Sequence, residues 1–176
     1  SASASRDAMG VFRNTLFTFR GQIMTDSIVP SKRTVHRESW DQYFLELAEK
    51  VSERSTCERA TVGAVLVQEH RIIATGYNGA ISGDPHCDEA GHLMRDGHCI
   101  RTIHAEMNAI IQCAANGVST HGATVYVNFF PCLNCTKALI QAGIKRVVYA
   151  QDYRNDPYGE ALLKQHHLDV VRLSQQ

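Results

Sequence analysis

Two short runs of residues carry side chains that bind transition metals. Residues 104–106 read His-Ala-Glu, and residues 131–135 read Pro-Cys-Leu-Asn-Cys. If a helix begins at the second run, its two thiols face one side within the first turn. The positive N-terminal end of a helix favours thiolates, the form of cysteine that binds zinc. Because three ligands leave one tetrahedral position free, His104, Cys132 and Cys135 predict a catalytic zinc site.

Glu106 lies two positions after His104, and we expect it to move protons rather than to bind the metal. Zinc lowers the pKa of a bound water to about 7, which makes hydroxide available at neutral pH. A neighbouring carboxylate that carries the protons typically contributes about 10²–10⁴-fold in rate. A Cys-x-x-Cys pair alone could also be a redox pair or half of a structural zinc knuckle. Those alternatives leave Glu106 without a role.

The elements that must position these side chains alternate along the chain. Strands are predicted at residues 62–68, 71–76, 124–130, 146–150 and 168–173. Helices are predicted at residues 39–51, 104–116, 132–142 and 156–167. Strands that alternate with helices in the later half indicate parallel pairing there. The pattern therefore predicts a three-layer α/β domain in which helices cover both faces of a central mixed five-stranded sheet.

Composition favours a small ligand over a polymer. Lys plus Arg and Asp plus Glu both number 18, so the formal net charge is zero. Nucleic-acid binders usually concentrate positive charge, and we therefore predict no polymeric nucleic acid partner. No apolar run approaches the roughly 20 residues of a membrane span, so no membrane partner is expected. Six cysteines without a secretory signal favour metal binding over disulfides and predict a cytoplasmic location.

The two metal-binding runs together resemble the signature of the zinc-dependent nucleoside and nucleotide deaminases. Within that superfamily, the chain is most similar to the deoxycytidylate (dCMP) deaminases of bacteria and phages. The similarity extends over residues 40–173 and includes the segments 54–57, 62–65, 76–79 and 142–145. It implies a cytidine-deaminase-like fold and the hydrolysis of dCMP to dUMP and ammonia. The zinc signature alone indicates only the superfamily.

Several residues are expected to bind the nucleotide: Arg59 from its place just before the first core strand, and Asn78 and Tyr153 from the resemblance. For the substrate we expect contacts from Arg59, Asn78, Ala105 and Tyr153, with Lys137 a weaker phosphate candidate. The guanidinium of Arg59 suits a phosphate or a sugar hydroxyl, although it could also be a surface cation beside Glu58. Asn78 and Tyr153 could equally be a plain turn residue and a loop tyrosine that covers the core.

Regulation and assembly are also implied by the resemblance. The dCMP deaminases are commonly homohexamers that dCTP with magnesium activates and dTTP inhibits. An effector site between subunits is expected at Gly76, Tyr77, Asn78 and Gly79, where the two glycines are expected to permit unusual backbone angles. The expected cofactors are therefore zinc and, with the dCTP effector, Mg²⁺.

A second zinc is expected in the polar segment 81–101, which needs something to order it. Three thiols and one imidazole form a closed, structural zinc site. The expected ligands are Cys57, Cys87, His92 and Cys99. His98 and His86 are alternatives for the imidazole, and unligated thiols in a loop are the alternative to a metal site.

Residues 1–23 differ from the remainder of the chain, since Ser and Ala alternate over the first five positions and Met24 could be a natural start. We interpret 1–23 as an expression-derived or disordered segment and 24–176 as a single zinc deaminase domain. An amphipathic arm at 11–20 that packs on a neighbouring subunit is the alternative.

Three residues with chemically active side chains receive no functional role. Cys113 is expected in the core, and His166 and His167 are expected at the surface. Rival functions are deamination of tRNA adenosine, of free cytidine or of a riboflavin precursor. A further rival is an inactive zinc-stabilised interaction module.

Overall fold

The computed structural model describes residues 16–19, 22–25, 33 and 35–173. The chain divides into two units, Ser1–Arg37 and Glu38–Gln176. In the first unit, β1 (Leu16–Phe19) and β2 (Gln22–Thr25) pair antiparallel. These paired strands were not predicted from the sequence, because residues 1–23 are expected there to be expression-derived or disordered. The rest of that segment lies outside the described residues, as does most of the arm at 11–20.

A five-stranded sheet with the order β11-β10-β9-β3-β4 forms the centre of the second unit. Its strands are β3 (Gly63–Gln68), β4 (Arg71–Tyr77), β9 (Thr124–Phe129), β10 (Arg146–Gln151) and β11 (Asp169–Arg172). β3 runs antiparallel to β4 and to β9, whereas β9, β10 and β11 are parallel. The sheet is therefore mixed, with its parallel part in the later half of the chain as predicted.

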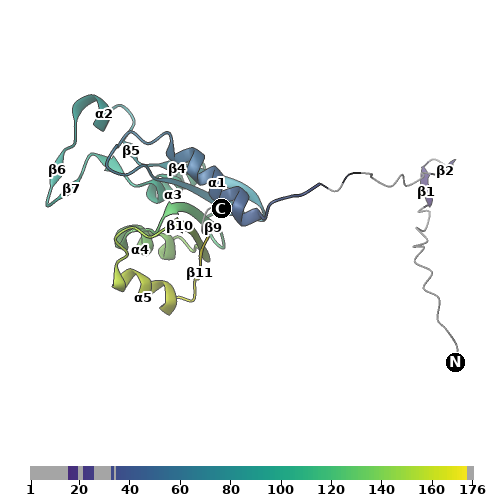
Figure 1. Cartoon of the computed structure of the whole chain (residues 1–176). Helices are drawn as coiled ribbons and strands as arrows, with labels where there is room; N and C mark the ends of the chain where they lie inside the picture. The colour runs from purple at the N-terminus through teal and green to yellow at the C-terminus, as the bar shows by residue number, and fades with distance from the viewer. Residues whose placement is uncertain (1–15, 20–21, 26–32, 34, 174–176) are drawn as a thin grey trace. The chain divides into compact units, whose positions relative to one another are not determined.

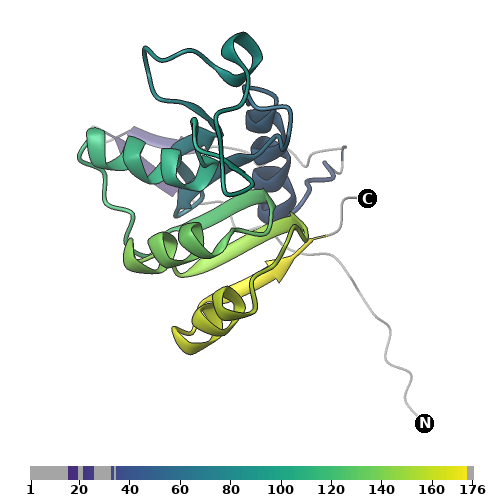
Figure 2. The ribbon, with the colours of Figure 1, turned by 90° about the vertical axis from the view of Figure 1, so that its left-hand side faces the viewer.

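Helices cover both faces of this sheet (Figure 2). Their bounds are α1 (Trp40–Ser52), α3 (Ala105–Ala115), α4 (Leu133–Gln141) and α5 (Pro157–Gln165). The alternating side chains of β3 show the two layers, because Ala64 and Leu66 pack with α3, α4 and α5 while Val65 and Val67 pack with α1. The three-layer α/β prediction is confirmed. Among the described residues, every helix is too short or too polar to cross a lipid bilayer.

Two glycines allow helices to rest directly on strand backbone. A Cβ on Gly63 would lie 2.1 Å from the carbonyl oxygen of Ala48 in α1, and a Cβ on Gly76 would lie 2.2 Å from that of Ala105 in α3. Neither Gly76 nor Gly79 has a positive φ, so the expectation of unusual backbone angles there was wrong. Gly76 is needed because α3 approaches β4 closely, and this contact sets the position of the first turn of α3.

The segment between β4 and α3 contains short elements that the sequence analysis did not predict. They are β5 (Gly79–Ala80), α2 (Cys87–Ala90), β6 (Met94–Arg95), β7 (His98–Cys99) and β8 (Thr102–Ile103). β6 and β7 form a hairpin whose turn residues, Asp96 and Gly97, both have positive φ. In Figure 1 this hairpin and α2 extend beyond the edge of the sheet. Elements of two to four residues are too short to produce a periodic pattern.

Candidate metal centre and pocket

The first turns of α3 and α4 bring the predicted zinc ligands together. His104 is the N-cap of α3, Cys132 is the N-cap of α4, and Cys135 lies in the first turn of α4. Nδ1 of His104 lies 3.4 Å from Sγ of Cys132 and 3.5 Å from Sγ of Cys135. All three ligand atoms lie within 4.8 Å of one another. One imidazole and two thiols at these separations fit a tetrahedral zinc ion with one position left for another ligand.

Hydrogen bonds within this trio favour a thiolate. Donation from Cys135 and from His104 lowers the pKa of the Cys132 thiol to about 4. The same contact with Cys132 raises the pKa of His104, and sharing a proton with Cys132 together with burial raises the pKa of Cys135. A thiolate at Cys132 is the form that binds a metal ion.

Glu106 lies beside the trio as the second residue of α3. Its side chain is buried, at 4% exposed, and this burial is the main cause of a raised pKa for its carboxyl group. The carboxyl group also contacts Cys135. A buried carboxyl group with a raised pKa can hold a proton at a pH where an ordinary glutamate would have lost it, as a proton carrier must.

A pocket of about 680 Å³ opens over the trio. His104, Glu106 and Cys132 line it at one end. All four residues expected to contact substrate line it as well: Arg59, Asn78, Ala105 and Tyr153. The pocket is large enough for a ligand of nucleotide size. Lys137, the weaker phosphate candidate, is exposed on α4 and is not among the lining residues.

Comparison with known proteins identifies the family. Residues 38–151 match the family model described as the cytidine and deoxycytidylate deaminase zinc-binding region. The chain belongs to this deaminase family. It is 53% identical over 139 residues to ComE operon protein 2 of Bacillus subtilis, an alignment that covers 79% of this chain and 74% of that protein. The resemblance inferred from the two metal-binding runs is therefore confirmed.

Two further relatives are named as deoxycytidylate (dCMP) deaminases. The deoxycytidylate deaminase of Saccharomyces cerevisiae is 38% identical over 146 residues, and the aligned part covers 78% of this chain and 46% of the yeast enzyme. The crystal structure of the dCMP deaminase from cyanophage S-TIM5 in complex with dCMP and dUMP matches with a TM-score of 0.68. That match has 32% identity and covers 78% of this chain and 100% of the phage chain. The cytidine-deaminase-like fold is confirmed by this likeness.

Asn78 supports the pocket wall of this deaminase through its whole side-chain amide. Its Oδ1 accepts a hydrogen bond from the backbone N–H of Val62 at 2.8 Å, and its Nδ2 donates to the carbonyl of Ala60 at 2.7 Å. Both polar atoms of the Asn78 side chain are therefore engaged with the main chain, and its role as a substrate contact stays a prediction. Of the four residues expected to bind an effector, Asn78 alone lines the pocket, while Gly76 and Gly79 are buried glycines of β4 and β5.

Asn128 of β9 makes the matching contacts from the other side, and sequence reasoning missed it. Its Oδ1 accepts from the N–H of Gly63 at 3.0 Å, and its Nδ2 donates to the carbonyl of Thr61 at 2.8 Å. The two amides of Asn78 and Asn128 together fix residues 60–63, of which Ala60 and Val62 line the pocket. The available signal was an asparagine within a run of apolar residues in this strand.

Tyr153 lies in the loop after β10, where the carboxyl ends of parallel strands carry ligand contacts in α/β folds. It is 42% exposed, and its ring lies 5.4 Å from that of Phe129. The next residue, Arg154, also lines the pocket and was missed. Its guanidinium carbon lies 5.5 Å from the centroid of the Tyr153 ring. A basic residue in this loop was the signal that could have identified it.

A second cysteine group forms where the structural zinc was expected. Ligand atoms of Cys57, Cys87 and His92 lie within 4.8 Å of one another. Sγ of Cys99 lies 3.7 Å from that of Cys87, and Sγ of Cys57 lies 3.9 Å from Nδ1 of His92. Of the candidate histidines, His92 is therefore the one beside the thiols. Three thiols and one imidazole fit a closed zinc site.

The thiols of this second group differ in pKa. Burial and the neighbouring Cys99 raise the pKa of Cys87 to about 12. Burial opposes ionisation of Cys99 as well, but hydrogen bonds from the backbone N–H of Arg101 and from His92 outweigh it and lower the pKa to about 7. The residues without an assigned role lie as expected, since Cys113 is buried and His166 and His167 are exposed.

Proposed function

We propose that this protein removes the 4-amino group of dCMP by hydrolysis, producing dUMP and ammonia. The observation that carries the proposal is the metal-binding trio of His104, Cys132 and Cys135 with buried Glu106 beside it at one end of a nucleotide-sized pocket. Membership of the deaminase family and the likeness to a dCMP-bound phage enzyme support the substrate.

Zinc held by His104, Cys132 and Cys135 would supply the activation of a water molecule as nucleophile. Glu106 takes up the two protons of the attacking water one after the other on its carboxylate oxygen, and it delivers the first to N3 of the ring and the second to the leaving amine, which departs as ammonia. Burial suits this role because the raised pKa lets the carboxyl group alternate between its two forms.

The remaining pocket residues hold the base. Phe129 and Phe130 give the pocket apolar walls that exclude bulk water from the reacting carbon. Ala105 is the first residue of α3, where a backbone N–H has no acceptor within the helix and is available to the base. Tyr153 lies on the same pocket and offers an aromatic ring to the pyrimidine.

A substrate panel tests this proposal. Zinc-loaded protein is offered dCMP, CMP, deoxycytidine, dCTP and adenosine, and ammonia release is followed. The expected result is the highest kcat/KM for dCMP. A clear preference for a nucleoside or for adenosine would overturn the substrate while leaving the deaminase chemistry in place. Release of ammonia from none of them would support an inactive module instead.

The second cysteine group is proposed to hold a structural zinc, with Cys57, Cys87, His92 and Cys99 as ligands. The donor set and the short separations support it. Metal analysis of the purified protein should then give two zinc ions per chain. A value of one zinc would remove the second site.

Regulation is proposed on the resemblance to the dCMP deaminases. In that reading the protein is a cytoplasmic homohexamer activated by dCTP with Mg²⁺ and inhibited by dTTP, with effectors bound near Gly76, Tyr77, Asn78 and Gly79. Velocity against dCMP should be sigmoidal and become hyperbolic when dCTP is added. Hyperbolic kinetics that neither dCTP nor dTTP alters would remove regulation, and light scattering would test the hexamer.

A further inference from the structure

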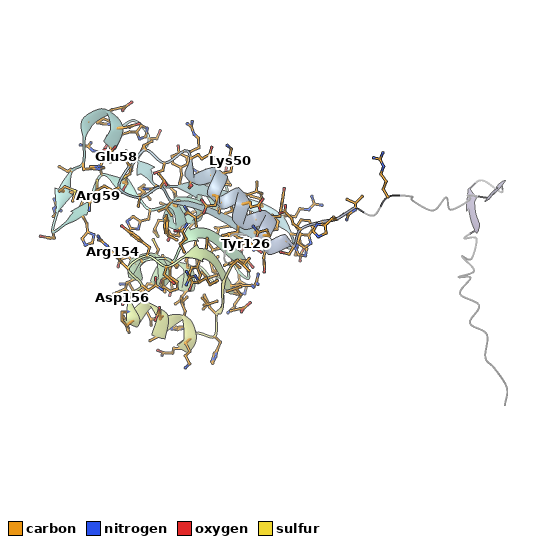
Figure 3. All side chains as sticks on the ribbon, in the orientation of Figure 1. Lys50, Glu58, Arg59, Tyr126, Arg154 and Asp156 are labelled. Atoms are coloured by element: carbon orange, nitrogen blue, oxygen red, sulfur yellow. The ribbon has the colours of Figure 1, made fainter. Side chains whose placement is uncertain are left out.

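The loop between β10 and α5 brings Tyr153 to the pocket, and the residue before it lies at the centre of the contacts that support this loop. Tyr153 lines the pocket with an exposed ring. Figure 3 shows Arg154 and Asp156 of the same loop on the side of the molecule where Arg59 lies, and these three residues also line the pocket. Asp152 is not among the lining residues. What it contributes to the site must therefore act through its neighbours.

Three side chains from different parts of the fold contact the Asp152 carboxylate. Arg172 of the edge strand β11 forms an ion pair with it, with Nη1 2.5 Å from Oδ2. Asn155, in the loop itself, donates from Nδ2 to Oδ1 at 2.9 Å. Burial and a hydrogen bond to this carboxylate raise the pKa of Tyr149 in β10. Asp152 therefore links the edge strand, the strand beside it and the loop.

These partners favour the charged form of Asp152. The hydrogen bond from Asn155 is the main cause of a lowered pKa for its carboxyl group, and the hydroxyl of Tyr149 and the charge of Arg172 act in the same direction. Hydrogen bonds to a charged acceptor are stronger than those to a neutral one. An amide at this position would lose the ion pair but would still offer Asn155 an acceptor oxygen.

The loop needs this support because part of its backbone adopts an uncommon conformation. Arg154 has a φ of 46°, in the left-handed region that few non-glycine residues adopt. Such residues persist only where the surrounding structure holds them. The side chain of Asn155 accepts from the N–H of Tyr153 at 3.1 Å and donates to Asp152, so one amide connects the Tyr153 backbone to the carboxylate. At the end of the loop, Asp156 accepts from two N–H groups of α5.

The supported loop places Tyr153 against an aromatic side chain of the sheet. The ring centroids of Tyr153 and Phe129 lie 5.4 Å apart, and both residues line the pocket. Phe129 ends β9, which pairs with β10, so the sheet fixes its position. Tyr153 is thus positioned at its ring by Phe129 and at its backbone by Asp152 acting through Asn155.

On the basis of the proposed deamination of a nucleotide, we infer that Asp152 is a positioning residue for nucleotide binding. It holds the loop after β10 so that Tyr153 keeps its place on the pocket, and Arg172 of the edge strand holds Asp152. Asp152 itself does not touch the nucleotide. It acts on affinity and not on the chemical step, which takes place at the metal-binding trio and Glu106.

Titration of zinc-loaded protein with dUMP measures this role. Asp152→Ala should weaken dUMP binding about 3- to 10-fold, the loss expected when one side chain must be ordered on binding. For dCMP, KM should rise by a similar factor while kcat changes by less than about 2-fold. Asp152→Asn and Arg172→Gln remove the ion pair but leave Asn155 its acceptor, so each should lose only about 2-fold.

A double-mutant cycle distinguishes positioning from a general structural defect. If Asp152 acts through Tyr153, then Asp152→Ala should cause no further loss of dUMP affinity in a Tyr153→Ala background. An equal loss in both backgrounds would overturn the inference, because the effect would then not pass through Tyr153. Unchanged dUMP affinity in the single variant Asp152→Ala would overturn it as well.

Asp169→Asn is the matched control. Asp169 begins β11 and forms an ion pair with Arg146 at 2.6 Å, at the opposite end of the strand from Arg172. It is not among the residues that line the pocket. This variant removes a carboxylate ion pair of the same strand and should leave dUMP affinity and KM unchanged. A loss as large as that in Asp152→Ala would attribute the effect to the strand and overturn the role of the loop.

Hydrogen exchange gives a readout that needs no nucleotide. The amides of residues 152–156 should exchange faster in Asp152→Ala than in the wild type or in Asp169→Asn, because the loop opens more often. Equal exchange in the three proteins, or a wild type that does not bind dUMP, would overturn the inference. Wild-type protein that binds dUMP but releases no ammonia from dCMP would overturn the proposed function instead, and the titrations and exchange rates would still decide the role of Asp152.

Discussion

Replacing Gly76 by alanine should separate the stability of the fold from the geometry of the site. An added Cβ would lie 2.2 Å from the carbonyl oxygen of Ala105 and 2.5 Å from the backbone nitrogen of Ala109. Both atoms belong to α3, the helix that His104 caps and that carries Glu106. Backbone atoms cannot rotate away, so the helix itself has to shift.

The size of the shift follows from contact distances. Ordinary non-bonded contacts begin near 3.4 Å, so α3 must move by roughly 1 Å. Overpacking of this kind costs about 1–3 kcal/mol of the free energy of unfolding. The lower entropy of the unfolded chain with alanine offsets about 0.4–1 kcal/mol of that cost. A displacement of about 1 Å at reacting groups can lower the rate about 10²-fold.

Gly63→Ala provides the matched control. Its Cβ would lie 2.1 Å from the carbonyl oxygen of Ala48, but this clash displaces α1, which contributes no residue to the pocket lining. Urea denaturation should show a loss of stability in both variants. Ammonia release per folded molecule should fall about 10²-fold in Gly76→Ala only. Equal activities in the two variants would refute the link between α3 packing and catalysis.

Three further predictions concern single side chains. Glu106→Gln should lower kcat about 10²–10⁴-fold with zinc content unchanged, as ammonia release and metal analysis would show, and undiminished kcat would refute the proton-carrier role. Asp41→Asn should lower the free energy of unfolding by about 1–2 kcal/mol at pH 7, because Arg146 then keeps only one of its two carboxylate partners, that of Asp169. The hydrogen bond from the Arg146 guanidinium lowers the pKa of Asp41, so its stabilisation is present above the unfolded pKa of the carboxyl group and is lost as pH falls through the folded pKa. Urea denaturation at pH 7 and below about pH 4 should therefore show that the difference in free energy of unfolding between wild type and variant becomes smaller at the lower pH. Cys99→Ser should reduce the zinc content by one ion per chain in metal analysis, whereas an unchanged zinc content would contradict its role as a ligand.

The zinc ligands and Glu106 could be predicted because their signal is local. The two thiols lie three positions apart at the start of one helix, and His104 caps another, so spacing along the chain translates directly into proximity. The long helices and core strands were equally accessible, since each repeats its apolar pattern several times.

Other parts of the site depend on contacts that no local pattern records. Arg154 and Asn128 become important only because the fold carries them to the pocket and its wall. The glycines of residues 76–79 were misread for a related reason. A glycine can serve an unusual φ or a close approach, and only the packing of α3 on β4 distinguishes the two at Gly76.

The paired amides of Asn78 and Asn128 have a consequence for how the site can diverge. They bind residues 60–63 only through main-chain groups: the carbonyls of Ala60 and Thr61 and the N–H groups of Val62 and Gly63. The side chains of the first three residues do not take part in these four bonds. Mutation or laboratory selection can therefore reshape this wall, and with it the choice of base, without removing the bonds that hold it in place.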